Sequence, residues 1–225
     1  MDTCGVPAHI WNRWTAFWWM LRHHGDPRPA LTDLGQRYGE PHRAYHTLEH
    51  IAHCLRELDA VRDHLDFAQF MLVESAIWYH DAVYDPRAKD NEEQSAQLAF
   101  NTLLGTEAFP LDAGQTLANM IRLSNHRDGF GVAIDVRDPR FPIATFLDID
   151  LAILGQDQAT YDAYATAIRR EYAHVPDDAF RAGRAAVLEQ FLARPRIYAT
   201  DHFHRKYEAQ ARANLTREIA KLRAS

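Results

Sequence analysis

The chain has 225 residues and a formal net charge of −6, from 25 Lys and Arg against 31 Asp and Glu. This balance argues against a protein that binds nucleic-acid polymers through a basic surface. With 47% hydrophobic and 25% charged residues, the composition is that of a globular protein, and the length suits one well-packed domain spanning 1–225.

The cysteines and the apolar segments indicate the compartment. Cys4 and Cys54 lie far apart and outside any zinc-knuckle spacing, which predicts neither a disulfide framework nor a structural zinc site. No secretory signal is recognisable at the start of the sequence. Residues 10–21 are apolar but include Arg13 and are too short to span a bilayer, so we expect a core-facing helix there. We therefore expect a cytoplasmic protein that does not bind a membrane.

Helical periodicity dominates the rest of the chain. After a Gly- and Pro-rich break, apolar residues recur at helical spacing in segment after segment. The expected helices span 30–38, 45–65, 67–82, 90–104, 112–126, 143–154, 157–173, 177–193 and 201–223. The stretch 127–142 is expected to be an irregular connection in which 132–136 could pair briefly, and no alternating pattern persists long enough for a sheet. The sequence predicts a single compact all-α domain.

A His-Asp doublet, His80 and Asp81, lies inside an apolar run at the end of the segment 67–82. If the helix continues through the doublet, Asp81 shares its face with Phe70 and Trp78. A carboxylate buried there without a partner would cost several kcal/mol, so a positive group should meet it. An Arg, a Lys or a metal ion would serve, and the neighbouring imidazole favours the metal.

The helix expected over 45–65 offers the first ligands. His46 and His50 are four residues apart on it and share a face, and His50 is nearest to the apolar stripe through Cys54. His53 lies close by in the sequence. A neutral imidazole at the border of the core suits a divalent ion, although a single such histidine is more often only hydrogen-bonded.

Asp150 is a second carboxylate that the helical pattern aims at the core. Its neighbours one turn away are all apolar: Phe146, Leu147, Ile153 and Leu154. An arginine from elsewhere, such as Arg122 or Arg184, could neutralise it without a metal. Two carboxylates and two imidazoles at such positions are nevertheless better explained together by one metal ion. The expected ligands are His50, His80, Asp81 and Asp150.

In chain order, these four residues resemble the metal-binding pattern of the HD-domain superfamily. Four stretches are more closely similar to the predicted metal-dependent HD-type phosphohydrolases of bacteria: Tyr45–Ile51, Trp78–Pro86, Asp90–Ala96 and Phe146–Gly155. With further segments that extend to 211–215, the resemblance covers most of the chain. It implies an all-α fold of HD-domain type and a metal-dependent phosphohydrolase. The implied substrate is a phosphomonoester or phosphodiester of a small metabolite or nucleotide, cleaved by a metal-activated water.

The expected metal chemistry follows from the ligand set. A divalent ion held by two His and two Asp keeps coordination positions open for water and for a phosphoryl oxygen. Mn²⁺, Mg²⁺, Fe²⁺, Co²⁺, Ni²⁺ and Zn²⁺ all suit these ligands, and the sequence does not choose among them.

Further residues could take part in the reaction. The expected catalytic residues are Asp81, His126 and Asp148. His126 could donate a proton or bind a second metal, or it is simply a histidine favoured at a helix C-terminus. Asp148 could orient a ligand or the water. Additional contacts to the metal or the substrate could come from His46, Arg43, Lys89, Glu93 and Arg122. The basic residues of this set are more often solvated surface charges, and Glu93 resembles the second half of a capping box that Asp90 begins.

Two other functions remain open at this point. A non-catalytic module could use the metal site to hold a nucleotide or to stabilise the fold. A di-iron oxygenase of HD type is a weaker alternative, in which His46, His53 and His126 supply the extra ligands. The expected partner is a small phosphorylated molecule, and neither a nucleic-acid polymer nor a membrane is expected.

Overall fold

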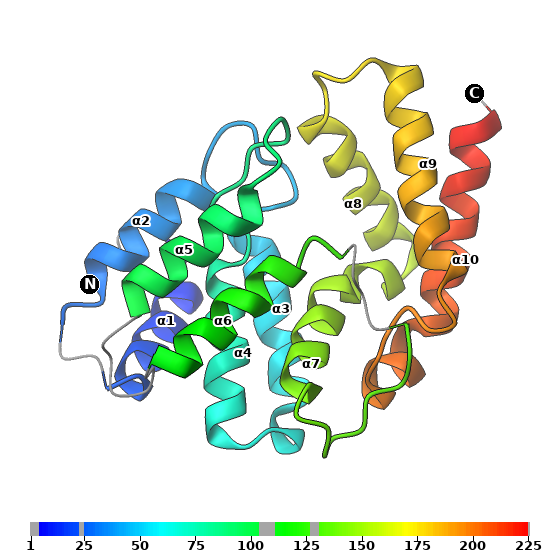
Figure 1. Cartoon of the computed structure of the whole chain (residues 1–225). Coiled ribbons are helices and arrows are strands. Elements are labelled where there is room, and N and C mark those ends of the chain that lie inside the picture. Colours follow the sequence, from blue (N-terminus) through cyan, green and yellow to red (C-terminus); the bar gives the residue numbers. More distant parts are fainter. Residues whose placement is uncertain (1–4, 23–24, 104–110, 127–130, 225) are drawn as a thin grey trace. The chain divides into compact units, whose positions relative to one another are not determined.

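The computed structural model describes residues 5–22, 25–103, 111–126 and 131–224, and helices account for most of these ranges (Figure 1). The prediction of an all-α fold is confirmed. Within the described residues the only β pairing recorded is an isolated parallel bridge between Ile134 and Thr200, inside the segment where brief pairing was expected. The chain divides into two compact units, Met1–Asp128 and Gly129–Ser225, which are described separately. One domain over the whole chain stays a prediction.

The first unit is built around a helix that is buried on nearly every side. Its elements are α1 (Ala8–Met20), α2 (Arg28–Tyr38), α3 (Leu48–Ala60), the 3₁₀ turn η1 (Arg62–His64), α4 (Phe67–Tyr79), α5 (Asn91–Leu103) and α6 (Leu111–Leu123). The central helix, α4, contacts α1, α3, α5 and α6. Its Trp78 packs edge-on against Trp14 of α1 with ring centroids 5.1 Å apart. Because α4 is surrounded, its C-terminal end, where the His-Asp doublet lies, is held firmly in the core.

The second unit is organised around a short buried turn. Its elements are α7 (Phe141–Asp150), the 3₁₀ turn η2 (Leu151–Gly155), α8 (Gln158–Glu171), α9 (Asp177–Ala193) and α10 (Asp201–Ala224). The turn η2 contacts α7, α8 and α10. Gly155 closes it against α10, and a Cβ at this position would collide with Tyr207. Asp150 therefore ends a helix whose continuation is fixed by packing.

Two helix ends differ from the sequence prediction, and both bear on the candidate ligands. Helix α3 begins at Leu48 because the Thr47 hydroxyl caps it by accepting the Glu49 N–H at 3.3 Å. His46 therefore precedes the helix, and the expected helical face shared by His46 and His50 is wrong.

Helix α4 ends at Tyr79, with His80 as its C-cap, so Asp81 lies beyond the helix. The expected burial of its carboxylate is wrong, because the Asp81 side chain is 18% exposed.

The carboxylate that is fully buried in the first unit is Glu74, for which the sequence indicated no role. It is paired with Arg13 of α1, whose Nε and Nη2 donate to the two carboxylate oxygens at 2.8 and 3.2 Å. The same guanidinium reaches Asp59 of α3 through Nη1 at 2.8 Å. Burial raises the pKa of Glu74, and the guanidinium opposes that rise. Arg13 thus joins α1, α3 and α4 through two carboxylates that are not among the expected ligands.

Removing Arg13 is expected to destabilise the protein by about 3–5 kcal/mol, because it leaves the Glu74 carboxylate buried without a partner. Equilibrium urea unfolding of Arg13→Met measures this loss. The double variant Arg13→Met with Glu74→Met is expected to recover most of it, since neither charge is then left unpaired. Equal losses in the single and double variants would contradict the pairing.

Candidate metal centre

His80 presents one ring nitrogen to the centre of the candidate site. Its backbone N–H continues the hydrogen bonding of α4 by donating to the Ala76 carbonyl oxygen at 2.9 Å, and its side chain is 1% exposed. Nδ1 lies 3.0 Å from the carbonyl oxygen of Ile77, which can only accept. Nδ1 therefore carries the proton in the neutral ring, and Nε2 presents its lone pair.

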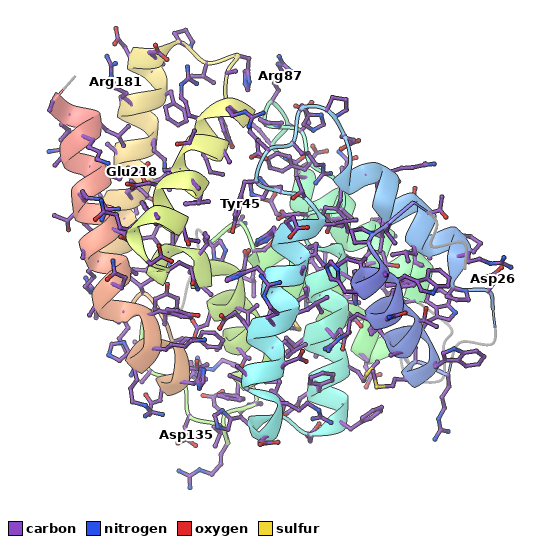
Figure 2. All side chains as sticks on the ribbon, turned by 180° about the vertical axis from the view of Figure 1, so that it is seen from behind. Asp26, Tyr45, Arg87, Asp135, Arg181 and Glu218 are labelled. Carbon is purple, nitrogen blue, oxygen red and sulfur yellow. The ribbon has the colours of Figure 1, made fainter. Side chains whose placement is uncertain are left out.

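His50 meets that lone pair from α3. Its Nε2 lies 3.1 Å from Nε2 of His80, and its side chain is 1% exposed. The buried thiol of Cys54, one turn along α3, lies 3.7 Å from the same nitrogen. The ring of Tyr45, labelled in Figure 2, packs against the His50 ring with centroids 4.8 Å apart. These contacts hold the imidazole of His50 in one orientation.

Asp81 brings a carboxylate oxygen to the two imidazoles. Its Oδ2 is 3.1 Å from Nε2 of His80 and 3.7 Å from Nε2 of His50. A third imidazole, that of His46, lies 4.0 Å from the same oxygen and is 19% exposed. The expected His50, His80 and Asp81 set is thus assembled within the first unit, on the side where Asp81 and His46 reach solvent.

This donor set fits a divalent metal ion. Two imidazole nitrogens and one carboxylate oxygen converge. In the deprotonated forms that bind metals, such groups repel one another unless a positive charge lies between them. Ligands about 2.1 Å from a common ion stand about 3.0 Å apart in octahedral and about 3.4 Å apart in tetrahedral geometry. The observed separations of 3.1, 3.1 and 3.7 Å are of that size. The His and Asp side chains of the first unit could therefore hold a metal ion.

Asp150, the fourth expected ligand, is the last residue of α7 in the second unit and is partly exposed. The apolar neighbours expected around it are present, since Phe146, Leu147, Ile153 and Leu154 are all buried. The two arginines considered as alternative partners are bonded to other carboxylates. Arg122 pairs with Glu93 at 2.6 Å, and Arg184 pairs with Glu218 at 2.9 Å. Metal binding by Asp150 stays a prediction.

Asp148 has a structural role that the sequence did not indicate. Its carboxylate is 2% exposed and accepts the N–H of Ala199 at 2.9 Å and the N–H and hydroxyl of Thr200 at 2.7 Å. It therefore fixes the chain where α10 begins, in the same unit. Burial raises the pKa of Asp148 to about 7, although the hydrogen bonds from Thr200 and Ala199 favour the charged form and lower the pKa. The expected catalytic role of Asp148 stays a prediction beside this role.

The remaining candidates lie outside the three-residue cluster. Glu93 and Arg122 form an exposed bidentate ion pair, so the cap expected from Glu93 is replaced by a link between α5 and α6. Lys89 is exposed. His126 lies beyond the end of α6 with a left-handed φ of +54° and is partly buried. Its expected roles stay predictions.

Arg43 is the residue whose importance the sequence did not reveal. The expectation was a phosphate contact, but its guanidinium is buried and donates to the carbonyl oxygens of His46, Asp81 and Ala82. No periodicity reports such a contact, because the acceptors are backbone atoms that every residue carries. Only its place in the link before α3, three residues ahead of His46, could have hinted at this role.

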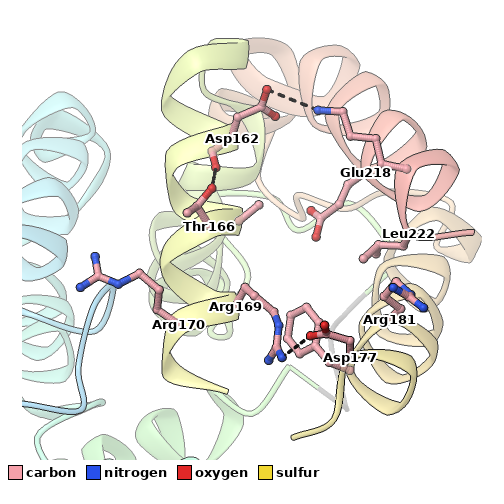
Figure 3. Close-up of a pocket in the computed structure, with 11 residues that line it drawn as sticks. Asp162, Thr166, Arg169, Arg170, Asp177, Arg181, Glu218 and Leu222 are labelled. Atoms are coloured by element: carbon pink, nitrogen blue, oxygen red, sulfur yellow. Dashed lines mark hydrogen bonds and ion pairs between the residues drawn. The ribbon is translucent and has the colours of Figure 1, made fainter. Parts of the chain in front are cut away.

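A cavity of about 550 Å³ lies within the second unit, between α8, α9 and α10 (Figure 3). No expected ligand lines it. Two ion pairs form across its rim, between Arg169 and Asp177 at 2.5 Å and between Lys221 and Asp162 at 3.6 Å. These contacts connect α8 to α9 and to α10.

Comparison with known proteins gives no match to a family model, to a curated protein or to a solved structure. The likeness to HD-type phosphohydrolases therefore stays an expectation. None of the helices in the described part of the chain is long and apolar enough to cross a membrane.

The raised pKa of Asp148 predicts a pH dependence of stability. Because its folded pKa of about 7 lies above the ordinary 3.8, the folded state holds this proton more tightly. The contribution of the protonated Asp148 carboxyl to the free energy of unfolding is complete below about pH 4. It is lost as the pH rises towards 7, by up to about 1.4 kcal/mol per pH unit. Urea unfolding in chelator at several pH values is expected to show a shallower decline for Asp148→Asn than for the wild type.

Asp157 provides the matched control, since it caps α8 in the same unit but is exposed and its pKa is lowered by Thr160. Asp157→Asn is expected to leave the decline between pH 5 and pH 7 unchanged, because that carboxylate titrates below this range. Identical pH profiles for Asp148→Asn and the wild type would contradict the buried, protonated carboxyl.

Proposed function

We propose that the protein is a metal-dependent phosphohydrolase that cleaves a phosphate ester of a small metabolite or nucleotide. The proposed ligands are His50, His80 and Asp81 of the first unit. Asp150 is proposed as the fourth from its place in the HD-type sequence pattern. The observation that carries the proposal is the convergence of two imidazole nitrogens and a carboxylate oxygen within 3.7 Å. Phosphate-ester chemistry is supported by the resemblance of the ordered ligand set to HD-type enzymes.

The four proposed ligands balance the charge of a divalent ion. His50 and His80 bind in their neutral forms, and the two aspartates contribute two negative charges. When bound, such an ion lowers the pKa of a coordinated water and withdraws charge from a phosphoryl group. The hydrogen bond that Nδ1–H of His80 donates to the Ile77 carbonyl oxygen leaves the Nε2 lone pair free to bind, and it makes this imidazole a stronger ligand.

The partly exposed residues face the proposed substrate. Asp81 and His46 are 18% and 19% exposed, whereas the two imidazole ligands are almost fully buried. Substrate therefore approaches from the side of Asp81. His46, whose Nε2 lies 4.0 Å from the Asp81 carboxylate, is suited to give a proton to the leaving oxygen. A cytoplasmic location is part of the proposal, in keeping with the reduced, buried Cys54.

The wild type is expected to bind a divalent ion stoichiometrically after chelator treatment and dialysis. Isothermal titration with Mn²⁺, Co²⁺ and Zn²⁺ measures the affinity. His80→Ala and Asp81→Asn are each expected to weaken it by more than about 100-fold, because each removes a donor atom. The matched controls His9→Ala and Asp63→Asn change exposed residues of the same unit and are expected to bind as the wild type does. A wild type that binds no divalent ion would overturn the proposal.

The same titration decides the fourth ligand. Asp150→Asn is expected to lower the affinity by at least about tenfold. If its affinity equals that of the wild type, Asp150 is not a ligand, and the three ligands of the first unit remain.

Hydrolysis is tested separately from binding. The metal-loaded wild type is expected to release phosphate from a panel of nucleotides or nitrophenol from a mono- or diester of nitrophenyl phosphate. His46→Gln is expected to lower kcat by about 100-fold or more with little effect on metal affinity, as removal of a general acid does. If the loaded protein is stabilised by nucleotides but turns none over, it is a binding module.

A further inference from the structure

Arg43 occupies the link between α2 and α3 and directs its whole guanidinium into the protein. Its side chain is 0% exposed. Nη1 donates to the carbonyl oxygens of Asp81 at 2.7 Å and of His46 at 3.1 Å, and Nη2 donates to that of Ala82 at 3.1 Å. Nε donates to the carboxylate of Glu40 at 2.9 Å, which balances the buried charge.

These contacts join the two segments that carry the proposed ligands. One segment is the turn after α4, which carries Asp81. The other is the approach to α3, where His46 precedes His50 by four residues. A single nitrogen, Nη1, bridges the carbonyl oxygens of Asp81 and His46, so the two backbones cannot move apart without breaking a partly buried hydrogen bond.

Aromatic rings hold the guanidinium in that position. The rings of Tyr38 and Tyr84 have centroids 5.2 and 5.4 Å from the Arg43 guanidinium carbon. The Tyr38 hydroxyl also donates to the carbonyl oxygen of Trp78 at 3.0 Å. The last carbonyl groups of a helix have no hydrogen-bond partner within the helix. Around the C-terminal end of α4, Tyr38 supplies a donor to the Trp78 carbonyl and Arg43 supplies donors to those of Asp81 and Ala82.

We propose that Arg43 is a positioning residue of the metal centre, which holds the Asp81 carboxylate against the His50 and His80 nitrogens. The inference rests on the proposed function, because it concerns the same ligands. It follows from the shape of guanidinium: one rigid planar group bonds four acceptors on two segments, which the compact ammonium of lysine cannot reach from one place. Arg43 itself touches neither metal nor substrate.

Arg13 offers a matched control, because it is also a mostly buried arginine that joins α3 to α4. Its partners are Asp59 and Glu74, and none of the proposed ligands is among them. Replacing either arginine by lysine removes comparable hydrogen bonds and keeps the positive charge. A difference between the two variants in metal affinity therefore reports on the position of the ligands, and stability in chelator reports on general packing.

The experiment measures two quantities for the wild type, Arg43→Lys and Arg13→Lys: the free energy of unfolding in chelator, and the dissociation constant for Mn²⁺ by titration. Both variants are expected to be less stable than the wild type without metal. Arg43→Lys is expected to bind Mn²⁺ about 10- to 100-fold more weakly, as is found when a partner of a ligand is lost. Arg13→Lys is expected to bind Mn²⁺ within about twofold of the wild type.

The outcomes separate this inference from the proposed function. If the wild type binds Mn²⁺ and Arg43→Lys binds it equally well, or if both lysine variants weaken binding alike, Arg43 has no positioning role and the metal site stands. If the wild type binds no divalent ion, the proposed function and this inference both fail. Should Arg43→Lys not fold, Tyr38→Phe, which removes only the hydroxyl bonded to Trp78, replaces it. The expectation is then a threefold or greater loss of affinity, and an unchanged affinity would overturn the inference.

Discussion

The structure of the first unit depends on one electrostatic constraint at the end of α4. The Nε2 atoms of His50 and His80 and an oxygen of Asp81 lie between 3.1 and 3.7 Å apart, and the Ile77 carbonyl fixes the proton of His80 on its other nitrogen. Three such atoms with free lone pairs, two of them on almost fully buried rings, are stabilised by a positive charge among them. A divalent ion satisfies all three at once, whereas a single proton satisfies only one pair.

Two arginines, Arg13 and Arg43, support the helices and turns around these three residues in different ways. Arg13 neutralises Glu74 and joins α1, α3 and α4, which stabilises the fold. Arg43 acts just beyond the C-terminal end of α4, where it donates to the carbonyl oxygens of Asp81 and His46. The Arg13 side chain is 25% exposed and pairs with carboxylates, whereas the Arg43 side chain is fully buried and donates mainly to backbone carbonyl oxygens. This difference is why Arg13 is assigned to stability and Arg43 to the metal centre.

Helical periodicity predicted the fold class and most of the elements, because the apolar face of a helix is formed by residues only three or four positions apart in the sequence. It failed at helix ends. The helix predicted to begin at Tyr45 begins at Leu48, with Thr47 as its N-cap. Helix α4 ends at Tyr79, although the apolar run continues beyond it. In both places a hydrogen bond to one side chain or backbone group decides the boundary, and the period does not report it.

The candidate site shows the same division. The residue types and order of His50, His80 and Asp81 were enough to predict that they gather, because imidazole and carboxylate at core positions need a common partner. The sequence placed the wrong carboxylates in the core, however. Asp81 and Asp150 are partly exposed, whereas Glu74 and Asp148 are almost fully buried. Their partners, Arg13 and the chain at the start of α10, are distant in sequence. Such long-range partners become visible only in three dimensions.

The most direct test of the metal centre is the position of a bound ion. Crystals of the protein grown with Mn²⁺ and measured at the manganese absorption edge would locate it by anomalous scattering. The account predicts a peak about 2.0–2.3 Å from Nε2 of His50, Nε2 of His80 and a carboxylate oxygen of Asp81. A manganese-loaded crystal with no peak among these three atoms, in which the two imidazoles remain in direct contact, would contradict it.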